Sequence, residues 1–176
     1  MKIRESLATD RSGIESLYLR AFESDEAADI ARLAVELLMM DGSSSCLSLV
    51  AFEAEKLLGH IAFSPLAFPA GCRTKGVILS PLAVDPDFQG KGLGSRLVRR
   101  GLEILRARNN ELVLVYGDPA YYGRFGFGAG VAEKFRPPYE LKYPTGWQGL
   151  ELQAGECGAE SIAVTCVPAL TRSELW

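Results

Sequence analysis

Metal-binding and redox side chains are scarce in this sequence. The chain contains a single histidine, His60, and four cysteines, none of them in C-x-x-C spacing. Because protein metal sites usually combine several histidines, cysteines or carboxylates at short spacings, we predict no metal site. Cys46 and Cys166 lie in strand-like runs and are expected to be small core hydrophobes, and the thiols of the chain are expected to be reduced rather than joined in a disulfide.

Long apolar runs and a strong charge of one sign are also missing. No apolar run approaches the roughly 18 residues of a membrane span, and the first six residues have no apolar signal region behind their charges. The net charge of −3 gives no reason to expect binding to nucleic acid or an anionic membrane. We therefore expect a cytoplasmic protein. Its 176 residues, 48% of them hydrophobic, suit a single domain over residues 1–176.

The most informative stretch is a glycine-spaced loop between a strand pattern and a helix pattern. An apolar run at residues 77–84 ends in Asp85-Pro86, and a helical pattern after the loop runs to about Arg108. Glycines at positions 90, 92 and 94 remove alternate side chains, so a ligand can approach the backbone closely. The N–H groups of the loop and of the helix start converge, which favours an anion such as a pyrophosphate. The stretch therefore predicts a phosphate cradle.

Two familiar phosphate-binding motifs do not fit this loop. A P-loop requires Ser or Thr after Gly-Lys, but Gly90-Lys91 is followed by Gly92. A dinucleotide-binding G-x-G-x-x-G motif that starts at Gly90 would end on Ser95. The string Gln89-Gly90-Lys91-Gly92-Leu93-Gly94 does read Gln-x-x-Gly-x-Gly, and it resembles the acyl-CoA signature of the GNAT N-acetyltransferase superfamily. The alternative is a glycine-rich turn that only caps a helix.

A second motif extends this resemblance. Tyr122 stands four residues before Gly126-Phe127, a spacing at which GNAT enzymes commonly carry a tyrosine. Together with Gly59-His60-Ile61 upstream, the segment 117–127 is similar to the YhbS-like branch of predicted N-acetyltransferases.

The order of elements agrees with this resemblance. Strand patterns at 46–52, 57–66 and 77–84 predict an antiparallel meander, and Pro81 belongs at a bulge or an unpaired edge because it cannot donate to a ladder. Ser24 is the expected N-cap of a helix that stops at Asp41-Gly42. The resemblance implies an α/β (α+β) fold with a mixed, mostly antiparallel central sheet, flanking helices and a V-shaped splay between the fourth and fifth strands. The cofactor core would span about 77–127, and closing strands would lie within about 128–176.

The resemblance also implies where acetyl-CoA, the acyl donor, would bind. The pantetheine arm would lie along the backbone of Leu82, Ala83 and Val84, and an N–H near Val84 would polarise the thioester carbonyl. The pyrophosphate would be held by Gln89 and by the N–H groups of the loop, which are those of Gly90, Lys91, Gly92, Leu93, Gly94 and Ser95.

The candidate catalytic residues are less specific. Tyr122 could protonate the departing thiolate, because a phenol with a pKa of about 10 is protonated at neutral pH. Tyr121 is the second choice, and the alternative for both is structural packing. His60 is the candidate base, although a lone strand histidine is more often structural. Many GNAT enzymes place a glutamate on the cofactor strand, where this chain has only Ser80, so a water relay is equally plausible.

We therefore predict an acetyl-CoA-dependent N-acetyltransferase that moves an acetyl group to a primary amine by direct attack in a ternary complex. The alternative is a non-catalytic module that binds CoA or acyl-CoA as a sensor or partner, and a third possibility is a structural interaction domain. No motif indicates which small-molecule or peptide amine is the acceptor. The aromatic segment Tyr139–Trp147 could pack against a second copy in a homodimer.

Overall fold

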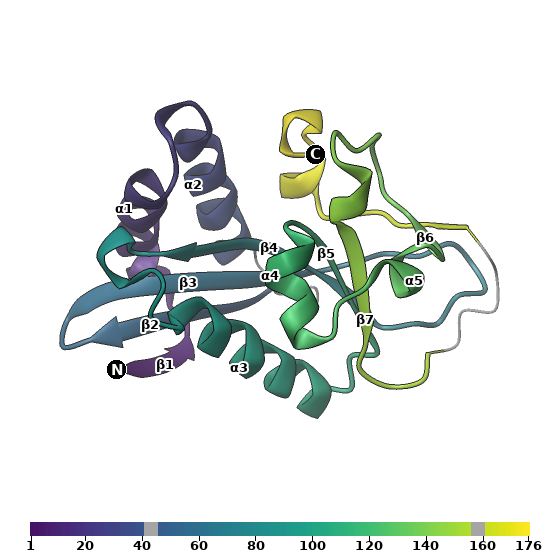
Figure 1. Ribbon diagram of the computed structural model, residues 1–176, viewed down its shortest axis with the longest axis horizontal. Helices are drawn as coiled ribbons and strands as arrows, with labels where there is room; N and C mark the ends of the chain where they lie inside the picture. Colours follow the sequence, from purple (N-terminus) through teal and green to yellow (C-terminus); the bar gives the residue numbers. More distant parts are fainter. Residues whose placement is uncertain (41–45, 156–160) are drawn as a thin grey trace. The chain divides into compact units, whose positions relative to one another are not determined.

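The computed structural model describes residues 1–40, 46–155 and 161–176 (Figure 1). They form two compact units, the first from Met1–Phe63 and Ser80–Gly101 and the second from Ser64–Leu79 and Leu102–Trp176. The main sheet has six strands in the order β1-β2-β3-β4-β5-β7. Its β4–β5 pair is parallel, whereas β1–β2, β2–β3 and β5–β7 are antiparallel. The mixed, mostly antiparallel sheet with flanking helices confirms the predicted fold class.

Four strands build the first unit, and the predicted strand patterns at 46–52, 57–66 and 77–84 correspond to the last three of them. The four strands are β1 (Lys2–Glu5), β2 (Leu47–Glu53), β3 (Lys56–Pro65) and β4 (Gly76–Val84), with the ends of β3 and the start of β4 belonging to the second unit. In the β2–β3 pair His60 lies opposite Val50. β2 is buried over most of its length, which matches its nearly continuous apolar sequence.

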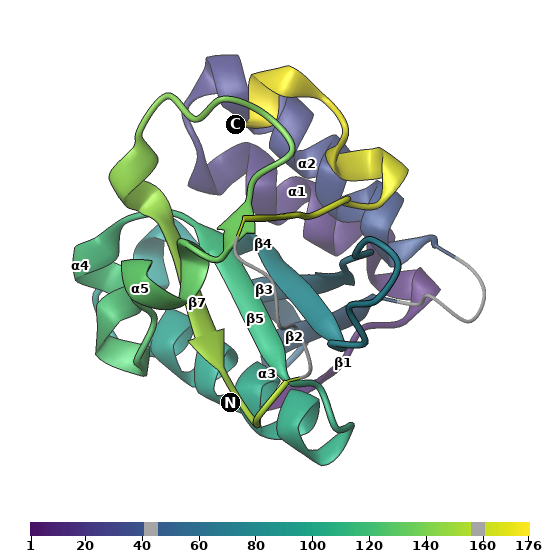
Figure 2. The ribbon, with the colours of Figure 1, turned by 90° about the vertical axis from the view of Figure 1, so that its right-hand side faces the viewer.

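Helices cover both faces of the strands in the first unit. α1 (Arg11–Ala21) and α2 (Ser24–Leu38) lie on one face, and α3 (Leu93–Ala107) lies on the other (Figures 1 and 2). Successive side chains of a strand point to opposite faces. His60 of β3 therefore reaches α1, whereas the ring of Phe63 packs against the helical Gly101 of α3.

Two sequence predictions in this region need correction or lie outside the description. α2 begins at Ser24 with Glu23 in the N-cap position, so the predicted cap is wrong by one residue. The helix ends at Leu38, and the predicted stop at Asp41-Gly42 lies outside the described residues. Glu23 makes no capping hydrogen bond through its side chain.

The cysteines differ in part from expectation. Cys166 is buried and Cys46 is partly buried, and both are free thiols, as predicted. Burial raises the pKa of Cys46 to about 11 and that of Cys166 to about 12, so both stay protonated at neutral pH. Cys72 is disulfide-bonded, which contradicts the expectation of reduced thiols, and Cys157 lies outside the described residues.

The second unit contains the end of the main sheet and a smaller sheet. Its strands are β5 (Leu112–Tyr116), β7 (Trp147–Glu151), and the parallel pair β6 (Phe135–Arg136) and β8 (Ile162–Ala163). Its short helices are α4 (Pro119–Tyr122) and α5 (Ala129–Ala132). Its single 3-10 turns occupy Gly123–Phe125, Pro144–Gly146, Pro168–Leu170 and Ser173–Leu175, and those of the first unit occupy Ala8–Asp10 and Pro86–Phe88. Of the predicted closing strands, the structure gives β7 and a short β8.

The aromatic segment Tyr139–Trp147 packs within its own chain. The rings of Tyr139 and Trp147 lie 6.2 and 6.0 Å from the ring of Trp176, and the Tyr139 hydroxyl donates to the carbonyl of Thr171. Only Tyr143 of this segment exposes a large aromatic surface, at 62%. None of the helices described is both long and apolar enough to cross a lipid bilayer.

Candidate functional site

The strand β4 extends beyond the residues that pair with β5. The parallel ladder ends at Leu79 opposite Val115, and β4 continues to Val84. Pro81, which has no N–H to donate, comes two residues after the last pair. The segment Leu82–Val84 therefore lies beyond the β4–β5 ladder, which is the pairing pattern that the predicted splay requires.

Asp85 fixes the bend that follows β4. Its carboxylate is almost fully buried and accepts the N–H of Asp87 at 3.2 Å, which caps the turn Pro86–Phe88. Arg20 and Lys56 each form an ion pair with it at 3.2 Å. Burial alone would raise the pKa of Asp85, but the hydrogen bonds from Lys56, the Asp87 N–H and Arg20 outweigh it and lower the pKa. Asp85 thus ties the bend to α1 and β3.

The loop after this bend presents unpaired backbone donors. Gly90 and Gly92 have φ values of +69° and +80°, a region that favours glycine, and an added Cβ would meet nothing within 4 Å at either position. Among the described residues, no backbone N–H from position 90 to 95 finds an acceptor, and the first to do so is that of Arg96, which donates to Gly92. The first N–H groups of a helix are free to bind an anion. The loop can therefore hold a phosphate group.

Gln89 and Lys91 are placed by short contacts within the same loop. The amide nitrogen of Gln89 donates to the carbonyl of Val84 at 3.1 Å, so it ties the loop to the end of β4. The ammonium group of Lys91 donates to the carbonyl of Asp87 at 2.8 Å and lies over the ring of Phe88. Both side chains thereby hold the loop in its bent form.

Tyr122 ends α4 in the second unit. Asp118 begins this short helix by accepting the N–H of Ala120 at 2.9 Å. The ring of Tyr122 fits against Gly117, where an added Cβ would stand 2.5 Å from the ring. Burial, with a smaller effect of Tyr121, raises the pKa of Tyr122 above its ordinary value. In the part of the chain that the structure describes, the Tyr122 hydroxyl has no hydrogen-bond partner.

Tyr121 is in direct contact with Tyr122 but has a different environment. The two rings meet edge to face at 5.0 Å between centroids. The guanidinium group of Arg124 lies 4.5 Å from the centre of the Tyr121 ring. Tyr121 therefore helps to pack Tyr122 and carries a cation on its own face.

His60 is enclosed in the first unit. Its ring is 0% exposed, with Nδ1 bonded to the Tyr18 hydroxyl and Nε2 to the Ser48 hydroxyl, both at 2.8 Å. Burial lowers the pKa of His60 to about 3, against the opposing effect of the Asp10 charge. The imidazole is therefore neutral at pH 7, and both its nitrogens are engaged.

The structure groups the predicted residues in three places. Leu82–Ser95 form one continuous strand end, bend and helix start, Tyr121 and Tyr122 form an aromatic pair, and His60 belongs to a buried polar network. Sequence reasoning missed the anchoring by Asp85 and the space that Gly117 gives the Tyr122 ring. The Asp-Pro pair that ends the strand pattern, an N-cap residue followed by proline, was the available signal for Asp85.

A mostly antiparallel sheet with one parallel pair, and a donor-rich bend leading from that pair into a helix, define the acetyltransferase class of fold. A family model described as "Acetyltransferase (GNAT) family" matches residues 7–127, and the chain belongs to this family.

Named relatives and solved structures agree with this assignment. The chain is 38% identical over 135 residues to "Uncharacterized N-acetyltransferase YjhQ" of Escherichia coli (strain K12), which covers 76% of this chain and 73% of that protein. It is 41% identical over 128 residues to "Uncharacterized N-acetyltransferase YhbS" of the same strain, covering 72% and 73%.

Two of the similar solved structures contain the coenzyme. The crystal structure of YhbS from Escherichia coli in complex with CoA has a TM-score of 0.82 at 32% identity, covering 97% of this chain and 92% of that chain. A GNAT acetyltransferase from Brucella melitensis in complex with acetyl-CoA has a TM-score of 0.64 at 29% identity, covering 92% and 94%.

Proposed function

We propose that this chain is an acetyl-CoA-dependent N-acetyltransferase that acetylates a primary amine by direct attack in a ternary complex. The observation that carries the proposal is the run of N–H groups from position 90 to 95 without acceptors among the described residues, at the start of α3. The complexes of similar proteins with CoA and acetyl-CoA support the same ligand.

The residues present fit this ligand. The loop N–H groups would hold the pyrophosphate, because glycine at positions 90 and 92 leaves open space beside the backbone. The end of β4 beyond the β5 ladder, Leu82–Val84, would hold the pantetheine arm through backbone hydrogen bonds, as an added strand does. Gln89, bonded to Val84, would keep the loop and the strand end in register.

Acetyl-CoA supplies the acetyl group as an activated thioester. Tyr122 would serve as the proton donor to the thiolate, since a phenol is protonated at neutral pH and its hydroxyl has no partner among the described residues. Tyr121 would position it by ring packing. The proton that the acceptor nitrogen loses would return to the tyrosine through solvent, so that the enzyme ends unchanged.

For the base, the surroundings of His60 favour the structural alternative. A neutral imidazole with both nitrogens bonded and no exposed surface has no free acceptor for a substrate proton. We therefore propose a water relay. The assignment of His60 as the base, a cytoplasmic location and a homodimer stay predictions from the sequence.

Calorimetric titration with acetyl-CoA tests the cradle. Gly92→Ala places a Cβ where φ is +80° and should weaken acetyl-CoA binding at least tenfold, because the backbone must leave the conformation that presents its N–H groups. Gly71→Ala is the matched control, since Gly71 has φ of +97° and equally open surroundings in another loop. Equal affinity in the two variants would contradict the cradle.

Transfer is tested by the release of free CoA thiol with a panel of primary amines. The proposal expects turnover with at least one amine. Tight binding of acetyl-CoA without turnover on any amine would instead support the non-catalytic binding module.

A further inference from the structure

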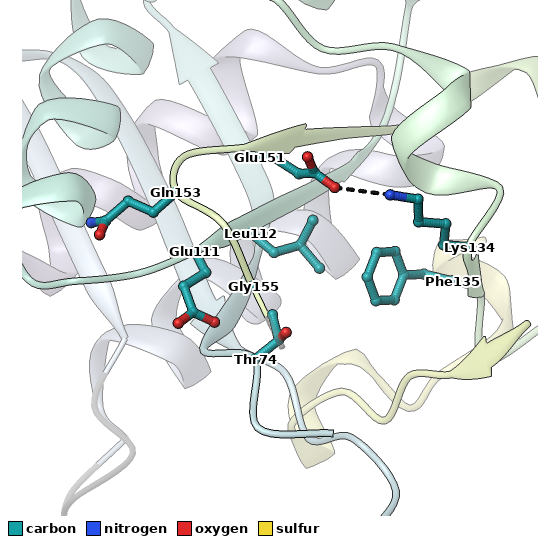
Figure 3. Close-up of a pocket in the computed structure, with 8 residues that line it drawn as sticks. All are labelled: Thr74, Glu111, Leu112, Lys134, Phe135, Glu151, Gln153 and Gly155. Atoms are coloured by element: carbon teal, nitrogen blue, oxygen red, sulfur yellow. Dashed lines mark hydrogen bonds and ion pairs between the residues drawn. The ribbon is translucent and has the colours of Figure 1, made fainter. Parts of the chain in front are cut away.

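A small pocket lies in the second unit beside Leu112, the first residue of β5 (Figure 3). Its volume is about 70 Å³, and the residues that line it include Leu112, Phe135 and Thr74. Since a single water needs at least about 10–15 Å³ of cavity volume, the space suits a ligand of only a few heavy atoms. None of these residues belongs to the acetyl-transfer site proposed above.

Two oxygen atoms face the same point in this pocket. Thr74 is 8% exposed, and its hydroxyl has no hydrogen-bond partner among the described residues. A Cβ at position 155 would stand 2.8 Å from this hydroxyl and 3.4 Å from a carboxylate oxygen of Glu111. The backbone of Gly155 therefore lies beside both oxygens, and a side chain at position 155 would collide with the Thr74 hydroxyl. A buried hydroxyl without a partner is costly, and a ligand that donates a hydrogen bond would remove that cost.

The charges around the pocket favour a cation. Glu111 accepts the N–H of Lys75 at 3.1 Å and has no cationic partner in the described part of the chain. The other carboxylate, Glu151, is neutralised by Lys134 at 3.1 Å, and Figure 3 shows this ion pair across the pocket from Thr74. One negative charge is thus left uncompensated.

The lining also distinguishes an organic cation from a metal ion. The described residues contain no group of three His, Cys, Asp or Glu side chains placed to hold a metal. Ca²⁺ takes six to eight oxygen ligands, which Leu112 and Phe135 do not supply. An alkylammonium ion instead needs acceptors for its N–H groups and apolar contacts for its carbon chain, and an aromatic ring adds a cation–π attraction.

We propose that this pocket binds a small primary alkylammonium ion, with the ammonium group between Glu111 and Thr74 and the alkyl chain against Leu112 and Phe135. The ion acts there as a ligand and is not consumed. For a ligand of three heavy atoms, the ceiling on binding energy per atom gives a dissociation constant of about 1 mM or weaker.

The test is a titration of the full chain with ethylammonium chloride, followed by ¹H–¹⁵N NMR. The amides of Lys75, Leu112 and Phe135 should shift saturably, and potassium chloride at equal ionic strength should not reproduce the shifts. Glu111→Gln keeps the acceptor for Lys75 but removes the charge, and should weaken binding at least tenfold. Glu140→Gln removes one exposed carboxylate elsewhere in the same unit and should leave binding within twofold.

Two further variants separate binding from folding. Thr74→Val removes the partnerless hydroxyl at constant shape, so it should weaken ethylammonium binding while thermal stability is unchanged or higher. Gly155→Ala fills the space without changing charge and should also weaken binding. Binding that is equal in Glu111→Gln and Glu140→Gln, shifts that potassium reproduces, or tighter binding of Mg²⁺ or Ca²⁺ at the same amides would overturn the proposal.

Discussion

The hydroxyl of Tyr18 on α1 lies 2.8 Å from Nδ1 of His60 on β3, inside the first unit. On the other side of the ring, Nε2 lies 2.8 Å from the hydroxyl of Ser48, which in turn lies 2.7 Å from that of Ser6. This network joins a helix and three segments of the strand region through a buried neutral imidazole. Because a buried polar group is costly unless it is bonded, the network specifies one arrangement of α1 on the sheet.

The depressed pKa of His60 predicts a pH dependence of stability. The folded protein holds the imidazole neutral down to a pKa of about 3, whereas an unfolded chain protonates it near 6.5. The stabilisation is present above pH 6.5 and is lost as the pH falls, at about 1.4 kcal/mol per pH unit between pH 6 and 4. Urea denaturation across this range should show that slope.

His60→Gln is the control for this slope. The variant should lose this part of the slope, because glutamine does not titrate. Asp10 and Asp85 have lowered pKa values, so their effect falls below about pH 4, outside the window. Parallel pH profiles for the two proteins would show that His60 does not cause the dependence.

The order of the elements and the position of the glycine-spaced loop could be predicted from the sequence because both rest on local patterns. The glycine spacing and the preceding strand placed the loop before α3, and the two positive φ values explain why glycine stands at positions 90 and 92. The environment of His60 could not be predicted, since Tyr18 and Ser48 are distant in sequence and meet the ring only through tertiary packing.

The N-cap of α2 and the pocket in the second unit also show where prediction from local sequence patterns stops. A serine followed by two acids signals a helix start, but the boundary moved by one residue, which is within the usual uncertainty of helix ends. The pocket beside Thr74 has no sequence signal, because its residues come from four separate segments of the chain.

Gly101 is predicted to be required in the middle of α3. A Cβ there would stand 2.3 Å from the ring of Phe63, so Gly101→Ala should destabilise the protein by about 1–3 kcal/mol despite the better helix propensity of alanine. Gly130→Ala in α5 meets nothing within 4 Å and should be neutral or slightly stabilising. Thermal denaturation of the two variants checks the contrast, which equal melting temperatures would contradict.

Asp85 is predicted to support both stability and acetyl-CoA binding. Asp85→Asn keeps an acceptor for the Asp87 N–H but loses the charge paired with Arg20 and Lys56, so unfolding should become easier by about 1–3 kcal/mol. Acetyl-CoA should bind more weakly, since the bend is less well fixed. Asp87→Asn makes the same charge change at an exposed neighbour and should alter neither quantity. A matching loss in both variants would point to net charge as the cause.

The most direct test of acetyl transfer is the steady-state rate of CoA release by Tyr122→Phe, measured together with its affinity for acetyl-CoA. If Tyr122 donates the proton, kcat should fall by about 10²–10⁴-fold while the dissociation constant of acetyl-CoA stays within twofold. Tyr143→Phe, the same change at an exposed ring, should leave both values unchanged. An unchanged kcat in Tyr122→Phe would contradict the assigned role, and no turnover by the unaltered protein with any primary amine would contradict the enzyme itself.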